Sequence, residues 1–260
     1  MTFKLSCLIY ALCIATGAAM RSLMLLYTID PVSGFIKNEY SLYAILIIVF
    51  LVAAAAIVFL SGTLLKTNSE LTPHIDGIPF SVVLVLMAAA IIYETFFSQL
   101  LDRASIFQKL LQYLFAAAAA VALLFIAFCK LTKRDFNPII SVAPIIFWIM
   151  RLIIIFTEFS TISTISDTVI ETASMCLALI TFLCYSKIEC AMPSKYQNLF
   201  LASAMLCGYV CALGSVPRII SDIMSVGQAV HLNTVPTFTA LACALFSTVF
   251  AYKLYMSIKK

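Results

Sequence analysis

The stretch YSLYAILIIVFLVAAAAIVFLSGTLL, from Tyr40 to Leu65, decides the fold class of this chain. It contains no charged side chain and lies between Glu39 and Lys66. An α-helix needs about 20 consecutive apolar residues to cross the hydrocarbon core of a bilayer, because each residue advances the helix by only about 1.5 Å. The stretch is therefore long enough to span a membrane.

The composition of the whole chain favours the same class. Of the 260 residues, 63% are hydrophobic and 11% are charged, and the mean hydropathy is +1.10. Soluble domains are about 45–50% apolar and about 25% charged, so a soluble core is too small to bury this much apolar surface. The same numbers exclude intrinsic disorder and a secreted disulfide scaffold. The net charge of +4 does not indicate nucleic acid as a partner, because most basic residues flank apolar stretches.

Seven further stretches have a similar length and composition. We therefore predict an all-α, polytopic bundle of about eight transmembrane helices, which forms one integral membrane domain over residues 1–260 and contacts the lipid bilayer. The first stretch also resembles a cleaved signal peptide, but we interpret it as a retained span because it stays apolar past Arg21. The seven stretches are Leu5–Tyr27, Pro79–Leu101, Phe107–Leu131, Pro138–Phe159, Val169–Tyr185, Leu199–Val216 and Val235–Met256.

The distribution of Lys and Arg predicts the orientation. With the N-terminus inside, ten of the 16 basic residues flank the inner ends of the spans and four flank the outer ends, among them Arg218, while Arg21 and Arg151 lie within spans. Cytoplasmic loops are enriched in Lys and Arg. Both termini are therefore predicted to be cytoplasmic, in a multi-pass protein of the cell membrane.

The chain also shows signs of an internal duplication. Met20-Arg21 in the first span and Met150-Arg151 in the fifth are offset by 130 residues, which is half of the chain. This spacing predicts two parallel four-helix repeats, residues 1–134 and 135–260, related by an axis along the membrane normal. The alternative is that apolar helices with basic inner ends align by chance.

Ionisable side chains inside the predicted spans gather toward the outer side. Such groups are costly in a bilayer and usually face a bundle interior or a wet cavity. On the fifth span, Trp148, Arg151 and Glu158 share one helical face. The candidate ligand or ion pocket consists of Arg21, Tyr93, Glu94, Trp148, Arg151, Glu158 and Glu171.

The residue types in this pocket predict the chemistry of a ligand. Arginine suits a bidentate contact to a carboxylate or phosphate, and Glu94 would neutralise Arg21 or Arg151. We therefore expect a small-solute transporter or transporter subunit, with an outward-facing polar site for an anionic or zwitterionic solute. The alternative is a non-transporting sensor or assembly subunit of a larger complex, in which the same charges form structural salt bridges. A homo- or hetero-oligomer in the membrane fits both hypotheses.

Sequence motifs for catalysis are missing from the chain. It has no P-loop, no H-E-x-x-H, no G-x-S-x-G and no histidine inside a predicted span. We therefore expect no enzyme, no cofactor and no metal site. Cys207 and Cys211 lie one helical turn apart, which leaves a metal pair as an alternative, but we interpret them as small residues that pack between helices.

One block of the chain resembles known sequences. The block consists of Trp148–Arg151, followed by Phe156-Thr157-Glu158 and a Ser/Thr-rich turn. It is similar to a block in uncharacterised polytopic membrane proteins of anaerobic Gram-positive bacteria. The resemblance covers the fifth and sixth spans. It implies a bacterial lineage and carries no activity.

Overall fold

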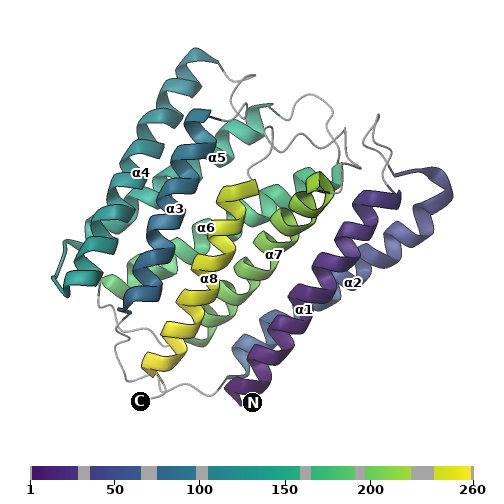
Figure 1. The fold of residues 1–260 in the computed structure, drawn as a ribbon, viewed down its shortest axis with the longest axis horizontal. Helices are drawn as coiled ribbons and strands as arrows, with labels where there is room; N and C mark the ends of the chain where they lie inside the picture. The colour runs from purple at the N-terminus through teal and green to yellow at the C-terminus, as the bar shows by residue number, and fades with distance from the viewer. Residues whose placement is uncertain are drawn as a thin grey trace.

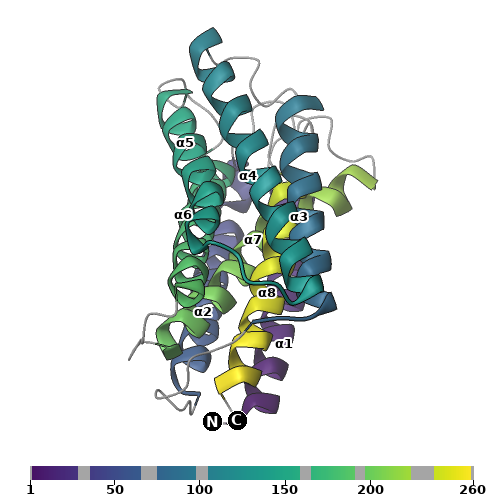
Figure 2. The ribbon, with the colours of Figure 1, turned by 90° about the vertical axis from the view of Figure 1, so that its left-hand side faces the viewer.

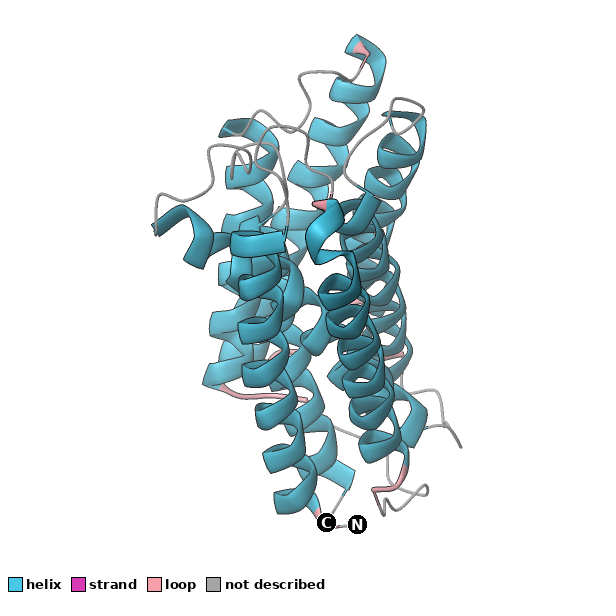
Figure 3. Cartoon of the chain, turned by 90° about the vertical axis from the view of Figure 1, so that its right-hand side faces the viewer, coloured by secondary structure: helices cyan, strands magenta, loops and turns pink. Residues whose placement is uncertain are grey.

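The computed structural model describes residues 2–28, 36–65, 75–97, 105–158, 165–190, 197–223 and 237–258. Almost all of these residues are helical, and none of them lies in a strand (Figure 3). Eight of the helices in this part of the chain are long and apolar enough to cross a membrane. The predicted all-α bundle of eight spans is thereby confirmed.

The helix bounds follow the predicted apolar stretches closely. Short π- and 3₁₀-helical turns extend three of the helices: η1 (Met24–Thr28) follows α1, η2 (Asn38–Tyr40) precedes α2, and η4 (Pro138–Val142) precedes α5. The eight long helices are α1 (Phe3–Leu23), α2 (Ser41–Thr63), α3 (Ile78–Phe97), α4 (Ile106–Thr132), α5 (Ala143–Glu158), α6 (Ile165–Glu189), α7 (Gln197–Ile223) and α8 (Thr237–Ile258).

Local sequence signals explain where α4 and η4 begin. The Ser105 hydroxyl accepts a hydrogen bond from the Gln108 backbone N–H at 3.3 Å, and the Gln108 side chain accepts one from the Ser105 N–H at 2.9 Å. This reciprocal capping box satisfies two N–H groups that the helix itself leaves open. Asn137 caps η4 in a similar way, and Pro138 follows at a position where a missing N–H costs nothing.

Six helices form a closed ring, which we call the six-helix ring. Going round it, α7 packs against α8, α8 against α3, α3 against α4, α4 against α5, α5 against α6, and α6 against α7. Helices α1 and α2 pack against each other and against α7, so they form a hairpin on the outside of the ring. Figure 1 shows this hairpin to the right of α7.

The start of α1 and the end of α8 lie at the same end of the bundle, which we call the terminal end (Figure 2). An even number of spans requires this arrangement. The first helices of the two predicted repeats have different surroundings, because α1 and α2 lie outside the ring whereas α5 and α6 belong to it. The duplication stays a prediction.

The distribution of apolar and polar side chains is typical of a bundle surrounded by lipid. Large apolar side chains of α2, such as Leu42, Leu46 and Val52, are exposed on the outside. Many polar side chains are buried between the helices instead, including Ser61, Gln112 and Thr181. Apolar residues on the outside and polar residues between the helices indicate contact with the bilayer.

A buried ion cluster ties three helices together near the terminal end. Lys130, in the last turn of α4, places its Nζ 3.1 Å from Asp76 before α3 and 2.9 Å from Glu189 at the end of α6. The Lys130 side chain is only 6% exposed, and Glu189 is 11% exposed. Lys130 is one of the ten basic residues at the predicted inner flanks, and it also bridges parts of the ring that are distant in sequence.

Helices α2 and α7 approach each other closely at Gly62. A Cβ atom on Gly62 would lie 2.6 Å from the Ala202 Cα of α7, which is too close for any side chain. Small residues at such crossings let helix backbones come together in a membrane, where van der Waals packing replaces the hydrophobic effect as the driving force. Gly62 therefore sets the distance between the outer hairpin and the ring.

Candidate functional site

Buried ionisable residues from four helices meet in the six-helix ring at the end opposite the terminal end. Glu94 lies near the end of α3 and Arg218 near the end of α7, whereas Glu171 lies near the start of α6, so chain direction brings all three to one end of the bundle. Arg151 lies in the second half of α5. We call these four charged residues together with Trp148 the polar cluster.

Burial separates the polar cluster from ordinary surface charges. Glu94, Arg151 and Arg218 are 2%, 5% and 4% exposed, Trp148 is buried as well, and Glu171 is half-buried. The charge of Glu94 is attracted by Arg151 and repelled by Glu171. Two carboxylates and two guanidinium groups sum to zero charge, which is the balance that a low-dielectric interior favours.

Glu94 has a structural task in addition to its charge. Its Oε1 accepts hydrogen bonds from the backbone N–H groups of Phe238 and Thr239, the latter at 3.0 Å. These N–H groups belong to the first turn of α8, where a helix has no acceptors of its own and carries partial positive charge. The carboxylate of α3 thus caps α8 from a neighbouring helix.

Removing this cap should destabilise the protein measurably. We expect Glu94→Ala to cost about 2 kcal/mol, because two buried N–H groups lose a charged acceptor, while Glu94→Gln should lose less because it keeps one oxygen. Thermal unfolding of the purified protein in one detergent measures both changes. Glu39→Ala, at an exposed position before α2, is the control and should be neutral. If Glu94→Ala and Glu39→Ala had the same melting temperature, the cap would contribute nothing to the stability of the protein.

A small cavity adjoins the polar cluster. Its volume is about 10 Å³, which is just enough for about one water molecule. It lies between α5, α6, α7 and α8. Its lining consists of Trp148, Glu171, Ser174, Met175, Cys211, Gly214, Arg218 and Ala240.

Two buried hydrogen-bond donors on α5 remain open, and one of them belongs to a residue that lines this cavity. Neither the Nε1 of Trp148 nor the Nε of Arg151 has a hydrogen-bond partner among the described residues. Trp148 lines the cavity, and Arg151 lies one turn further along α5. Both groups can only donate. A buried donor without an acceptor costs about 1–3 kcal/mol, so this part of the ring is suited to a ligand that brings acceptor oxygens.

Two predicted site residues lie apart from the polar cluster. Arg21 is 2% exposed, but it belongs to the hairpin outside the ring, and its Nη1 donates to the Met24 sulfur at 3.2 Å. Tyr93 is 47% exposed and packs edge-on against Phe238. The side chain of the remaining candidate, Glu158, lies outside the described residues.

Arg218 is the residue that sequence analysis left out of the site. We expected the seventh span to end at Val216, before Pro217, with Arg218 in an outer flank. Instead α7 continues through Pro217 to Ile223, and Arg218 is buried. Neighbouring helices tolerate proline in a membrane span. The spacing of Cys211 and Arg218, seven residues apart on one helical face, is the signal that places Arg218 beside the cavity.

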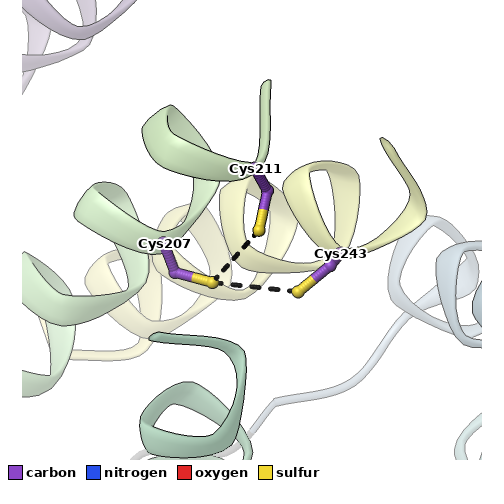
Figure 4. A group of neighbouring side chains, drawn as sticks. All are labelled: Cys207, Cys211 and Cys243. Carbon is purple, nitrogen blue, oxygen red and sulfur yellow. Dashed lines mark hydrogen bonds between the residues drawn. The ribbon is translucent and has the colours of Figure 1, made fainter. Parts of the chain in front are cut away.

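Among the described residues, one group has the residue types and spacing to hold a metal ion. It consists of Cys207, Cys211 and Cys243, whose sulfur atoms all lie within 4.8 Å of one another (Figure 4). The polar cluster itself contains no histidine or cysteine. Its chemistry is that of charge pairing and hydrogen bonding.

Comparison of the chain with models of protein families, with curated proteins and with solved structures finds no match.

Proposed function

We propose that this integral membrane protein is a small-solute transporter or transporter subunit whose polar cluster binds an anionic or zwitterionic solute. The observation that carries the proposal is the pair of open donors on α5, Trp148 Nε1 and Arg151 Nε, of which Trp148 lines a cavity together with Arg218. Intramembrane charges that line a cavity between helices usually mark a substrate or ion pathway. A carboxylate or phosphate group offers the acceptors that these donors need.

The size of the cavity sets a condition on the mechanism. About 10 Å³ holds one water and no larger solute. Binding therefore requires the helices around the cavity to move apart, as when α5 and α6 shift against α7 and α8. Transporters expose a fixed site alternately by such movements of one helix group against another. In this proposal the structure represents an occluded state.

The orientation is part of the proposal. The ten basic residues at the inner flanks, against four at the outer flanks, support cytoplasmic termini. The polar cluster lies at the end opposite the terminal end, so in this orientation it is nearer to the outside. Solute would reach it from the external solution.

One observation favours the second candidate, a non-transporting sensor or assembly subunit. Glu94 links α3 to the start of α8 through backbone hydrogen bonds, and the cavity beside the polar cluster is small. A purely structural cluster would have these features too. A purely structural cluster binds no solute, whereas a transporter must bind one.

Solute-induced stabilisation distinguishes the two candidates. The purified protein is heated with phosphate, sulfate, glutamate or glycine betaine as probes, and the melting temperature is recorded. At about 100 times its Kd a ligand stabilises the folded state by about 2.7 kcal/mol, so at least one probe should raise the melting temperature by several degrees. Arg151→Leu should lose this rise.

Arg134→Leu is the matched control, because Arg134 is exposed beyond the end of α4. It should respond to the probe as the wild type does. If no probe stabilises the wild type, or if Arg151→Leu is stabilised equally, the solute site does not exist and the structural role remains.

A further inference from the structure

Three cysteines meet in the middle of the bundle, in a group that we call the thiol cluster. Cys207 and Cys211 lie one turn apart on α7, and Cys243 faces them from α8 (Figure 4). The Cys207 sulfur is 3.9 Å from that of Cys211 and 3.8 Å from that of Cys243. All three residues are free thiols and are at most 1% exposed.

These separations match those of sulfur atoms around one metal ion. A metal–sulfur bond of about 2.3 Å gives sulfur–sulfur distances of about 3.8 Å at tetrahedral angles and about 4.0 Å at trigonal angles. The two distances from Cys207 agree with these values without movement of either helix. The third distance, between the Cys211 and Cys243 sulfur atoms, is at most 4.8 Å, so the three sulfur atoms lie close enough together to surround one ion.

The surroundings of the thiol cluster can support thiolate ligands. The hydroxyl groups of Thr181 on α6 and Ser247 on α8 adjoin Cys207, and both residues are fully buried. The Tyr10 hydroxyl of α1, bonded to Thr248 at 2.8 Å, lies within electrostatic range of all three thiols. Polar groups around the ligands commonly orient them and tune the affinity for the metal.

The ligand set indicates which metal fits. Soft thiolate sulfur prefers soft or borderline ions such as Cu(I) and Zn(II). Structural zinc sites almost always have four protein ligands, whereas the group has three among the described residues. A monovalent ion also brings less charge into a membrane interior, where charge is costly.

We propose that Cys207, Cys211 and Cys243 form a binding site for Cu(I). Each thiol that binds as a thiolate releases its proton to water, the copper ion stays Cu(I), and no electron is transferred. One lost proton leaves the site neutral, and each further proton lost adds one negative charge, which a hydrogen bond from the open Ser247 hydroxyl beside Cys207 would stabilise. The earlier interpretation of Cys207 and Cys211 as packing residues is replaced by this proposal.

The cavity beside the polar cluster adjoins the thiol cluster. Cys211 belongs both to the thiol cluster and to the lining of the cavity beside Glu171 and Arg218. The Cys211 sulfur also lies 4.0 Å from the Ser174 carbonyl oxygen, across the contact of α6 with α7. An ion that reaches the polar cluster is thus one side chain away from the thiols. The copper site does not depend on the solute site, because its ligands are different residues.

Competition for Cu(I) tests the proposal. The reduced, purified full-length protein is titrated anaerobically with Cu(I) in the presence of a chromophoric Cu(I) chelator. We expect one Cu(I) per chain with high affinity. Losing a group that only hydrogen-bonds to a metal ligand already lowers metal affinity by about 10–100-fold. Cys207→Ser and Cys243→Ser each remove a ligand itself, so each should weaken binding of Cu(I) by at least about 100-fold.

Cys184→Ser is the matched control, because Cys184 is also a buried thiol beside a hydroxyl group, that of Ser203 on α7. It should bind Cu(I) as the wild type does. Wild-type-like binding by Cys207→Ser and Cys243→Ser would overturn the proposal, and so would absence of high-affinity binding to the wild type. Tighter binding of Zn(II) than of Cu(I), in a parallel titration, would overturn the choice of metal.

A measurement on the wild type keeps the test decisive if the serine variants fail to fold. X-ray absorption of the copper-loaded protein should show about three sulfur ligands at about 2.3 Å and no nitrogen ligand. Nitrogen or oxygen ligands, or only two sulfur ligands, would contradict a site made of these three cysteines.

Discussion

Replacing Lys130 by Met is expected to lower the melting temperature of the purified protein by about 10 °C. The Lys130 ammonium group lies 3.1 Å from Asp76 and 2.9 Å from Glu189, and it is almost fully buried. Removing one partner of a buried ion pair costs about 3–5 kcal/mol, because the remaining charge has lost its compensation. In a chain of this size each kcal/mol shifts the melting temperature by roughly 2–4 °C.

The partner of Lys130 provides a second, sharper comparison. Lys130→Met combined with Glu189→Gln should recover part of the loss, because Glu189, the more deeply buried of the two carboxylates on Lys130, is then no longer charged. Lys133→Met, at an exposed position three residues further along the chain, is the control and should melt like the wild type. If Lys130→Met melts like Lys133→Met, the ion cluster does not hold the ring together.

The second large effect is expected at the crossing of α2 and α7. Gly62→Val should destabilise the protein by about 3 kcal/mol or more, because its first side-chain atom would already meet the Ala202 backbone at 2.6 Å. Backbone atoms cannot rotate away as a flexible side chain can. The α1–α2 hairpin must therefore shift on α7, and thermal unfolding should show a large drop in the melting temperature.

Gly214→Ala is the matched control for this prediction. A Cβ atom on Gly214 would meet only ordinary contacts, at 3.6 Å from Ile170 and from Ser174. Alanine is favoured over glycine inside a helix by about 1 kcal/mol, so this variant should melt at or above the wild-type temperature. Similar stability of Gly62→Val and Gly214→Ala would contradict the close helix crossing.

The eight spans could be predicted from the sequence because a bilayer imposes a simple rule of length and apolarity. The buried face of α5 could be predicted as well, since Trp148, Arg151 and Ile155 recur at helical spacing and all three are buried. Both predictions depend on one helix at a time. They need no information about which helices are neighbours.

The composition of the polar cluster could not be predicted in full, because it depends on helix neighbours. Arg21 and Arg151 have equivalent places in the sequence pattern, yet α1 lies outside the six-helix ring and α5 within it. Arg218 was assigned to a flank because the seventh apolar stretch ends at Val216, whereas α7 continues through Pro217, which neighbouring helices tolerate in a packed membrane bundle. In the thiol cluster, only the α7 pair is visible from spacing, and Cys243 joins it through the packing of α8.

Transport by the reconstituted protein tests the central claim most directly. The probe that stabilises the protein most is supplied in radiolabelled form to liposomes that contain the wild type, Arg151→Leu or Arg134→Leu, and the label inside is counted over time. The account predicts uptake above that of empty liposomes for the wild type and for Arg134→Leu, and none for Arg151→Leu. Uptake no faster than in empty liposomes by a wild type that binds the probe would contradict a transporter, and equal uptake by Arg151→Leu would contradict the role of the polar cluster.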